Sequence, residues 1–233
     1  MFIKDYVLRY SDLDRNGEVK ICSVIDLLQD ISIAHCDAVG FSTEKMAGMQ
    51  VAWLLDGWRI KVFEKLDPKK KVTVKTGIMK IKATQTERKY EVWQGDELKI
   101  KAGAIWFTVD TSAMRIIRVP EGFLNAYNVV DEDEDCKFLK FKSGDGADFV
   151  RKTKVERRDL DTNNHMNNVK SAEVLVNVMP EGFNVADLLI RYRKELALGE
   201  EIAIRTKDED GDFYGELVNS ENQVCVMMKG MTK

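Results

Sequence analysis

The sequence has few histidines and prolines and no paired cysteine motif, and these shortages exclude several classes of protein. Its 233 residues include two histidines, so a histidine-rich metal centre is excluded. The four cysteines contain no C-x-x-C pair, which favours buried thiols over disulfides or zinc ligands. The formal net charge of −3 gives no indication of a nucleic-acid partner.

Hydrophobic runs are also shorter than a membrane helix requires. No apolar stretch approaches the roughly 20 residues that span a bilayer. The first residues, Met1 to Tyr6, lack the charged-then-apolar pattern of a signal peptide. We therefore expect a cytoplasmic protein with no membrane partner. The composition, 44% hydrophobic and 32% charged, is typical of a globular protein with one large domain or two small ones.

The sequence repeats itself in two blocks that occur in the same order. Residues 12–16 (Asp-Leu-Asp-Arg-Asn) match residues 159–163 (Asp-Leu-Asp-Thr-Asn). Residues 60–76 match residues 190–206 at a constant offset. Two matching blocks in one order favour a duplicated domain.

The two copies are predicted to differ just after the repeated motif. Val19-Lys20 matches Val169-Lys170, but the offset is three residues larger than in the motif. This predicts a three-residue insertion within 164–168 of the second copy. That stretch contains His165, which has no counterpart in the aligned first copy, so we expect the chemistry in the second copy.

Each copy has the pattern of a helix followed by antiparallel strands, which is typical of an α+β fold. Apolar residues spaced three and four apart predict a helix from about Cys22 to near Gly40, and a second helix is predicted over 169–178. Alternating apolar and polar residues predict strands, with hairpin turns at 94–96 and 219–222. The predicted strands are 72–76, 90–92, 98–102, 213–218 and 224–228.

The predicted domain boundaries are 1–128 for the N-terminal domain, 129–150 for a linker and 151–233 for the C-terminal domain. Five consecutive acids, 131–135, are interpreted as a solvated part of the linker. Residues 137–158 contain eight lysines or arginines and three acids. This stretch is interpreted either as a docking face for an acidic protein or as solvated surface.

The motif of the second copy is unusually polar. Residues 159–168 contain two carboxylates, four carboxamides and one imidazole just before a predicted helix. Helix capping accounts for one or two of these residues but not for His165. A helix N-terminus offers unpaired N–H groups, and a carboxylate acts as a base or a nucleophile. This combination suits thioester hydrolysis through a tetrahedral oxyanion.

The pattern Asp-Leu-Asp-x-Asn-x-His-x-Asn-Asn-Val-Lys at 159–170 resembles the C-terminal motif of the acyl-acyl-carrier-protein (acyl-ACP) thioesterases. Residues 9–14 and 58–60 also resemble that family, and the chain is identified as a bacterial member of its plant type. The resemblance implies a tandem (double) hot-dog fold, in which each half is an antiparallel sheet wrapped around a long helix. It further implies hydrolysis of fatty acyl-ACP to free fatty acid, which ends fatty acid synthesis. Acyl carrier protein would be the partner, and no cofactor is implied.

The resemblance also assigns site residues, and its catalytic set falls on Asp161, Asn163, His165 and Glu195. Plant members have a cysteine after the glutamate, but Leu196 stands here, so a cysteine nucleophile is not available at this position. Two mechanisms remain open. In the first, Glu195 or Asp161 activates a water; in the second, Asp161 attacks the thioester to form a mixed anhydride. The oxyanion is expected at the backbone N–H groups of Asn168 and Val169.

Two features of the first copy allow more than one interpretation. The apolar stretch 46–55 is either core or an acyl-binding pocket, with Met49, Trp53 and Leu55 as candidate pocket residues. His35, next to Cys36 on a helix, is interpreted as a core or groove-lining histidine, because adjacent helix positions point about 100° apart. Residues 12–17 resemble the start of a calcium loop, but the closing position is Ser23 instead of glutamate.

Three other functions remain open: an acyl-CoA thioesterase, a hot-dog hydratase or dehydratase, and a non-catalytic acyl-binding sensor. The asparagine-rich motif and Glu195 favour hydrolysis, and a sensor does not need His165. The duplicated chain is expected either as a monomer, a pseudo-dimer in itself, or as a homodimer. Acyl-chain length is not encoded in these motifs.

Overall fold

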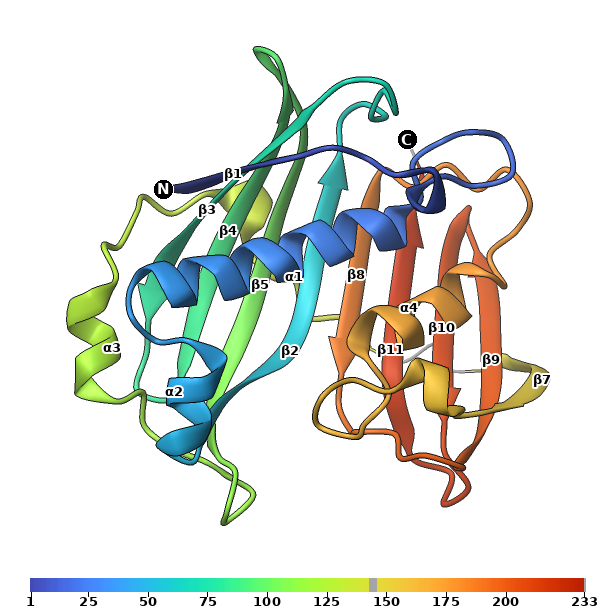
Figure 1. Cartoon of the computed structure of the whole chain (residues 1–233). Helices are drawn as coiled ribbons and strands as arrows, with labels where there is room; N and C mark the ends of the chain where they lie inside the picture. Colours follow the sequence, from blue (N-terminus) through green and yellow to red (C-terminus); the bar gives the residue numbers. More distant parts are fainter. Residues whose placement is uncertain (143–145, 233) are drawn as a thin grey trace. The chain divides into compact units, whose positions relative to one another are not determined.

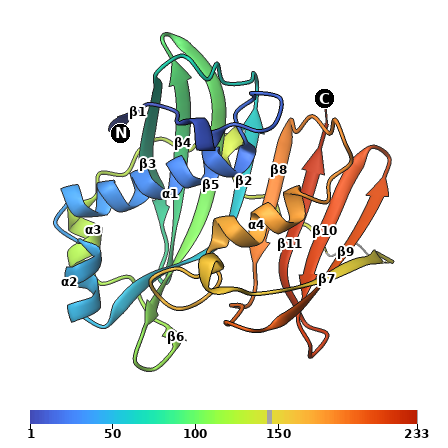
Figure 2. The same ribbon diagram turned by 45° about the vertical axis from the view of Figure 1, so that its right-hand side comes forward.

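The computed structural model describes residues 1–142 and 146–232. Its chain divides into two compact units, Met1–Phe138 and Leu139–Lys233 (Figures 1 and 2). Residues 143–145, which belong to the expected linker and basic stretch, lie outside the described residues. Among the described residues, no helix has the length and apolar character needed to cross a membrane.

The first unit is an antiparallel sheet with a long helix, α1 (Ile21–Ala38), lying across one face (Figure 1). Its strands are ordered β1-β3-β4-β5-β2, and β6 pairs with β5. Two short helices complete the unit. In the chain, α2 (Thr43–Gly48) follows α1, and α3 (Glu121–Ala126) follows the strands. The strand bounds are Phe2–Tyr6 (β1), Val51–Val62 (β2), Val72–Ile81 (β3), Gln85–Gln94 (β4), Glu97–Asp110 (β5) and Arg115–Ile116 (β6).

The second unit repeats this plan with a shorter helix, α4 (Asn168–Val176), which lies over β10 and β11 (Figure 2). Its antiparallel sheet is ordered β8-β11-β10-β9-β7. The strand bounds are Asp148–Lys154 (β7), Asp187–Tyr192 (β8), Glu201–Glu209 (β9), Asp212–Val218 (β10) and Val224–Met231 (β11). The expected α+β class and tandem hot-dog fold are therefore confirmed.

Burial of one helix face holds α1 on its sheet. Val24, Ile25, Leu28 and Ile31 are at most 2% exposed, as their helical spacing predicts. Across from them the sheet contributes large buried side chains such as Trp58. The helix ends at Ala38, and Gly40 two residues later has a φ of +82°, a backbone conformation that glycine adopts without strain. The predicted helix from Cys22 to Gly40 is thus confirmed within two residues.

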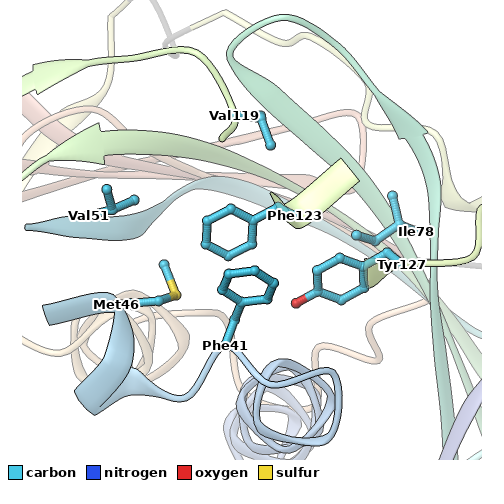
Figure 3. Packing of buried hydrophobic residues seen from close by; sticks show 7 residues of the cluster. All are labelled: Phe41, Met46, Val51, Ile78, Val119, Phe123 and Tyr127. Carbon is cyan, nitrogen blue, oxygen red and sulfur yellow. The ribbon is translucent and has the colours of Figure 1, made fainter. Parts of the chain in front are cut away.

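A second apolar cluster lies where α2, α3 and the end of α1 meet β2 and β3. Figure 3 shows its seven side chains pointing towards one another, with the rings of Phe41 and Phe123 stacked at 4.0 Å between centroids. The cluster consists of Phe41, Met46, Val51, Ile78, Val119, Phe123 and Tyr127. It closes one end of the first unit.

The acidic run 131–135 differs in part from the solvated segment expected from the sequence. Asp135 pairs with Lys61 at 2.7 Å, and Asp133 pairs with Lys101 at 2.8 Å. Lys61 and Lys101 are opposite each other on β2 and β5, so the two acids neutralise a like-charged cross-strand pair. The short helix Glu134–Cys136, which includes the last two acids, packs against Gly103, where even a Cβ would lie 1.6 Å from the Cys136 carbonyl oxygen. Asp133 and Asp135 are therefore fixed to the first sheet, while the other three acids are exposed, as expected of a solvated segment.

The four cysteines carry free thiols, and three of them, at positions 22, 136 and 225, are buried. Burial raises the pKa of the Cys136 thiol to about 12. The expectation of buried thiols is confirmed at these three positions.

His35 lies half-buried on α1 among aromatic and polar side chains. Its ring stacks on Phe2 at 5.1 Å and meets Tyr127 edge-on at 5.0 Å between centroids. The buried Arg88 donates from Nη1 to His35 Nδ1 at 2.8 Å, with the ring nitrogen as acceptor. Cys36 instead receives the Tyr127 hydroxyl at 3.0 Å. The two neighbours therefore have different hydrogen-bond partners, which fits the interpretation of His35 as a core or groove-lining histidine.

The environment of His35 predicts a pH-dependent stability. Burial and the Arg88 guanidinium lower its pKa from 6.5 to about 4. The unfolded chain therefore binds one more proton between these values, and the free energy of unfolding decreases as the pH falls from about 6.5 towards 4. We expect His35→Gln, which keeps an acceptor for Arg88, to flatten this decrease. The measurement is the urea midpoint of unfolding of both proteins at neutral and at mildly acidic pH. An equal decrease of the midpoint in the two proteins would contradict the prediction.

Candidate active site

The polar motif of the second unit forms a tight turn just before α4. The N–H of Asp161 donates to the His165 carbonyl at 2.9 Å. The Asp161 carboxylate closes the turn from the other side, because Oδ1 accepts the N–H groups of Asn163 at 2.8 Å and of His165 at 3.3 Å. Asn164, between them, has a φ of +62°, a left-handed conformation that asparagine tolerates. One carboxylate oxygen therefore fixes the turn that carries His165.

His165 lies beside Glu195, with 3.3 Å between Nε2 and Oε2. The side chains are 33% and 45% exposed, so the pair is open to water and to a substrate. Backbone pairing brings the two together: Met166 N donates to Leu196 O at 2.8 Å, and His165 bridges to Ala197. Leu196, where plant members have a cysteine, is 2% exposed and points into the core.

The helix start next to this pair is capped by a side chain of the motif. Asn167 Oδ1 accepts the N–H of Val169 at 2.8 Å. Of the two amides expected to hold an oxyanion, that of Val169 therefore already has an acceptor. The carbonyl of Asn168 accepts the Tyr192 hydroxyl at 3.1 Å and the Ser171 hydroxyl at 2.8 Å. Sequence reasoning did not single out Tyr192, and the only signal was its place on the strand that leads to Glu195.

The four expected catalytic residues contact one another to different degrees. Asp161 and His165 share the turn, and Glu195 contacts His165. The Asn163 side chain is exposed, and its amide nitrogen lies 3.5 Å from Asp161 Oδ2. Asn163 therefore supports the turn in this structure.

The three acyl-binding candidates of the first unit lie in different surroundings. Trp53 packs against the cluster of Figure 3 and meets Phe123 edge-on at 5.5 Å between ring centroids. Leu55, further along β2, is 2% exposed, and Met49, just after α2, is 43% exposed. Of the three, Trp53 is therefore the one that borders the cluster.

The first unit contains the same turn as the second. The N–H of Asp14 donates to the Glu18 carbonyl at 2.8 Å. Asp14 Oδ1 accepts the N–H groups of Asn16 at 2.8 Å and of Glu18 at 2.9 Å. These are the bonds of Asp161, each between residues 147 positions earlier in the chain. The duplication predicted from the sequence is therefore visible in the hydrogen bonds.

The predicted three-residue insertion is wrong. The first residues of the two helices, Ile21 and Asn168, are also 147 positions apart, so the two copies stay in step from the turn into the helix. The Val-Lys match at a larger offset was a chance similarity. In the corrected alignment, Glu18 occupies the position of His165.

The residue that pairs with this position also differs between the two units. Lys65, which precedes Glu195 by the 130 positions of the second repeat block, contacts both carboxylate oxygens of Glu18 at 2.7 and 2.8 Å. The alignment holds in the backbone, because the amides at 63 and 64 share one carbonyl just as those at 193 and 194 do. A Glu18–Lys65 ion pair thus stands in the first unit where the His165–Glu195 pair stands in the second.

Comparisons with known proteins find relatives that match nearly the whole chain. A chloroplastic acyl-[acyl-carrier-protein] hydrolase of Cuphea viscosissima is 22% identical over 247 residues, which cover 95% of this chain and 59% of the relative. The chain thus spans under two thirds of that relative's length. Among solved structures, an acyl-ACP thioesterase from Bacteroides thetaiotaomicron matches with a TM-score of 0.91 at 17% identity, covering 100% of this chain and 97% of the other. The 12:0-ACP thioesterase from Umbellularia californica matches at 0.85 and 18%, covering 99% and 96%.

Family models account for both units. The acyl-ACP thioesterase N-terminal domain matches residues 1–127, and the acyl-ACP thioesterase C-terminal domain matches residues 143–229. The two matches follow each other in the chain in the order of the two hot-dog units. The chain therefore belongs to the acyl-ACP thioesterase family.

Proposed function

We propose that the protein hydrolyses the thioester of fatty acyl-ACP and releases free fatty acid. The observation that carries this proposal is the His165–Glu195 pair, 3.3 Å apart and partly exposed beside a helix start. An imidazole in contact with a carboxylate takes a proton from a water that attacks a carbonyl. Membership of the acyl-ACP thioesterase family supports the substrate.

The chemistry follows from what these groups do at a thioester carbonyl. A water beside the pair gives up a proton to it and forms a bond to the carbonyl carbon. The N-terminal end of α4, with the Asn168 amide as the proposed donor, stabilises the oxyanion through its N–H groups and partial positive charge. A donor role for Val169 requires that Asn167 release its amide. The carbon–sulfur bond then breaks, and the leaving thiolate takes the proton back from the pair.

Three other functions differ from this one in the chemistry or in the carrier. A hydratase or dehydratase moves a proton on the acyl chain itself, and a sensor binds the chain unchanged. An acyl-CoA thioesterase differs only in the carrier. Membership of the acyl-ACP thioesterase family favours hydrolysis of acyl-ACP over these alternatives.

The carrier is proposed to dock on the basic segment that leads into the site. β7 is exposed along nearly its whole length, and Arg157 and Arg158 after it are exposed too. Val155 lies between β7 and these arginines. Its carbonyl accepts the N–H of Gly199 at 3.0 Å, and Gly199 follows Glu195 by four residues in the chain. Acyl carrier proteins are acidic, so opposite charges would bring the thioester to the His165 turn.

The acyl chain is proposed to bind in the first unit, with Trp53 as the principal contact and Leu55 and Met49 as further candidates. The support is the position of Trp53 at the border of the apolar cluster (Figure 3). A cytoplasmic location is likewise proposed, since the free thiols fit a reducing compartment.

The substrate proposal is tested by incubating the protein with saturated acyl-ACPs of several chain lengths and measuring free fatty acid. We expect release from at least one of them, and Glu195→Gln lowers kcat by about 100-fold or more, because the proton acceptor is lost. Glu201→Gln is the matched control, since Glu201 pairs with Lys152 on an exposed strand. Absence of free acid from every acyl-ACP would contradict the proposal.

The docking proposal is tested with Arg157→Glu and Arg158→Glu together. We expect KM for acyl-ACP to rise about tenfold at low salt and the difference to shrink as salt screens the charges. Hydrolysis of a small acyl thioester without carrier protein should be unchanged. An equal loss with both substrates would show that the arginines act on the site and not on docking.

A further inference from the structure

We infer that Asp161 is a positioning residue that holds the turn bearing His165, and that it is not the nucleophile. The attacking group is a water activated by the His165–Glu195 pair. This inference rests on the proposed hydrolysis and decides between two mechanisms that the sequence leaves open.

The duplicated chain contains its own control for Asp161. Asp14 makes the same three turn bonds, at 2.8, 2.8 and 2.9 Å, in a unit where Glu18 and Lys65 replace the imidazole and its carboxylate. The carboxylate therefore serves the same turn whether or not a His–Glu pair stands beside it. Closing the turn is a sufficient reason for an aspartate at this position.

The turn bonds also make the carboxylate a poor nucleophile. Asp161 Oδ1 accepts two amides, and Oδ2 has the Asn163 carboxamide at 3.5 Å. Hydrogen bonds to an ionised carboxylate stabilise its charge and weaken its attack on carbon.

Glu195 has the opposite surroundings. Its side chain is 45% exposed, and Oε2 faces His165 Nε2. A water at this pair loses its proton to Nε2 or Oε2 while its oxygen bonds to the carbonyl carbon. The carbon–sulfur bond breaks, the proton goes to the leaving sulfur, and the acid is released. No covalent bond to Asp161 forms at any stage.

The deciding experiment compares Asp161→Asn with Asp161→Ala. Asparagine keeps an Oδ1 acceptor for the turn amides but cannot form a mixed anhydride. We expect Asp161→Asn to keep kcat within about tenfold of wild type, whereas Asp161→Ala loses about 100-fold or more because the His165 turn loosens. Equal inactivity of the two variants would overturn the inference and favour a nucleophilic Asp161.

Amide hydrogen exchange gives a readout that does not depend on turnover. Exchange at His165 should be slow in wild type and Asp161→Asn and faster in Asp161→Ala. Asp14→Ala is the matched control: exchange accelerates at Glu18, while kcat stays unchanged. Unchanged exchange at His165 in Asp161→Ala would overturn the positioning role. If wild type releases no fatty acid from any acyl-ACP, the proposed function fails while the exchange result still decides the role in the turn.

Discussion

The site of the second unit depends on one stretch of backbone pairing. The Met166 N–H donates to the Leu196 carbonyl, and the His165–Ala197 bridge continues this contact. Through it, a turn that precedes α4 meets the segment that follows β8, although thirty residues separate them in sequence. Without this pairing His165 and Glu195 would lie on unrelated loops. The hot-dog sheet thus positions His165 and Glu195, because it fixes where these two segments meet.

The two duplicated units share the same turn but have different side-chain pairs beside it. In the second unit the pair combines an imidazole with a carboxylate. In the first, Glu18 and Lys65 form an ion pair that holds the turn and places no imidazole beside it. The comparison separates the parts of the motif that serve the fold from those that serve the reaction. The aspartate belongs to the first group, and the histidine and the second acid belong to the other.

Much of the fold and part of the site could be predicted from the sequence. Helical spacing located α1, alternation located the strands, and the motif located His165, because these patterns are local. Glu195 was assigned by the family resemblance. The exchange of Glu18 for His165 was missed, since a chance Val-Lys match shifted the alignment and only the hydrogen bonds corrected it. The fixed positions of Asp133 and Asp135 were missed because their lysine partners lie on strands far away in sequence, and their fit depends on the missing side chain of Gly103.

The central claim is that the His165 position does chemistry in the second unit and only holds structure in the first. The most direct measurement is the kcat of free fatty acid release from acyl-ACP for His165→Gln and for its counterpart Glu18→Gln. The account predicts a loss of about 100-fold or more in the first variant. It predicts a kcat close to that of wild type in the second. An active His165→Gln, or an equal loss in Glu18→Gln, would contradict it.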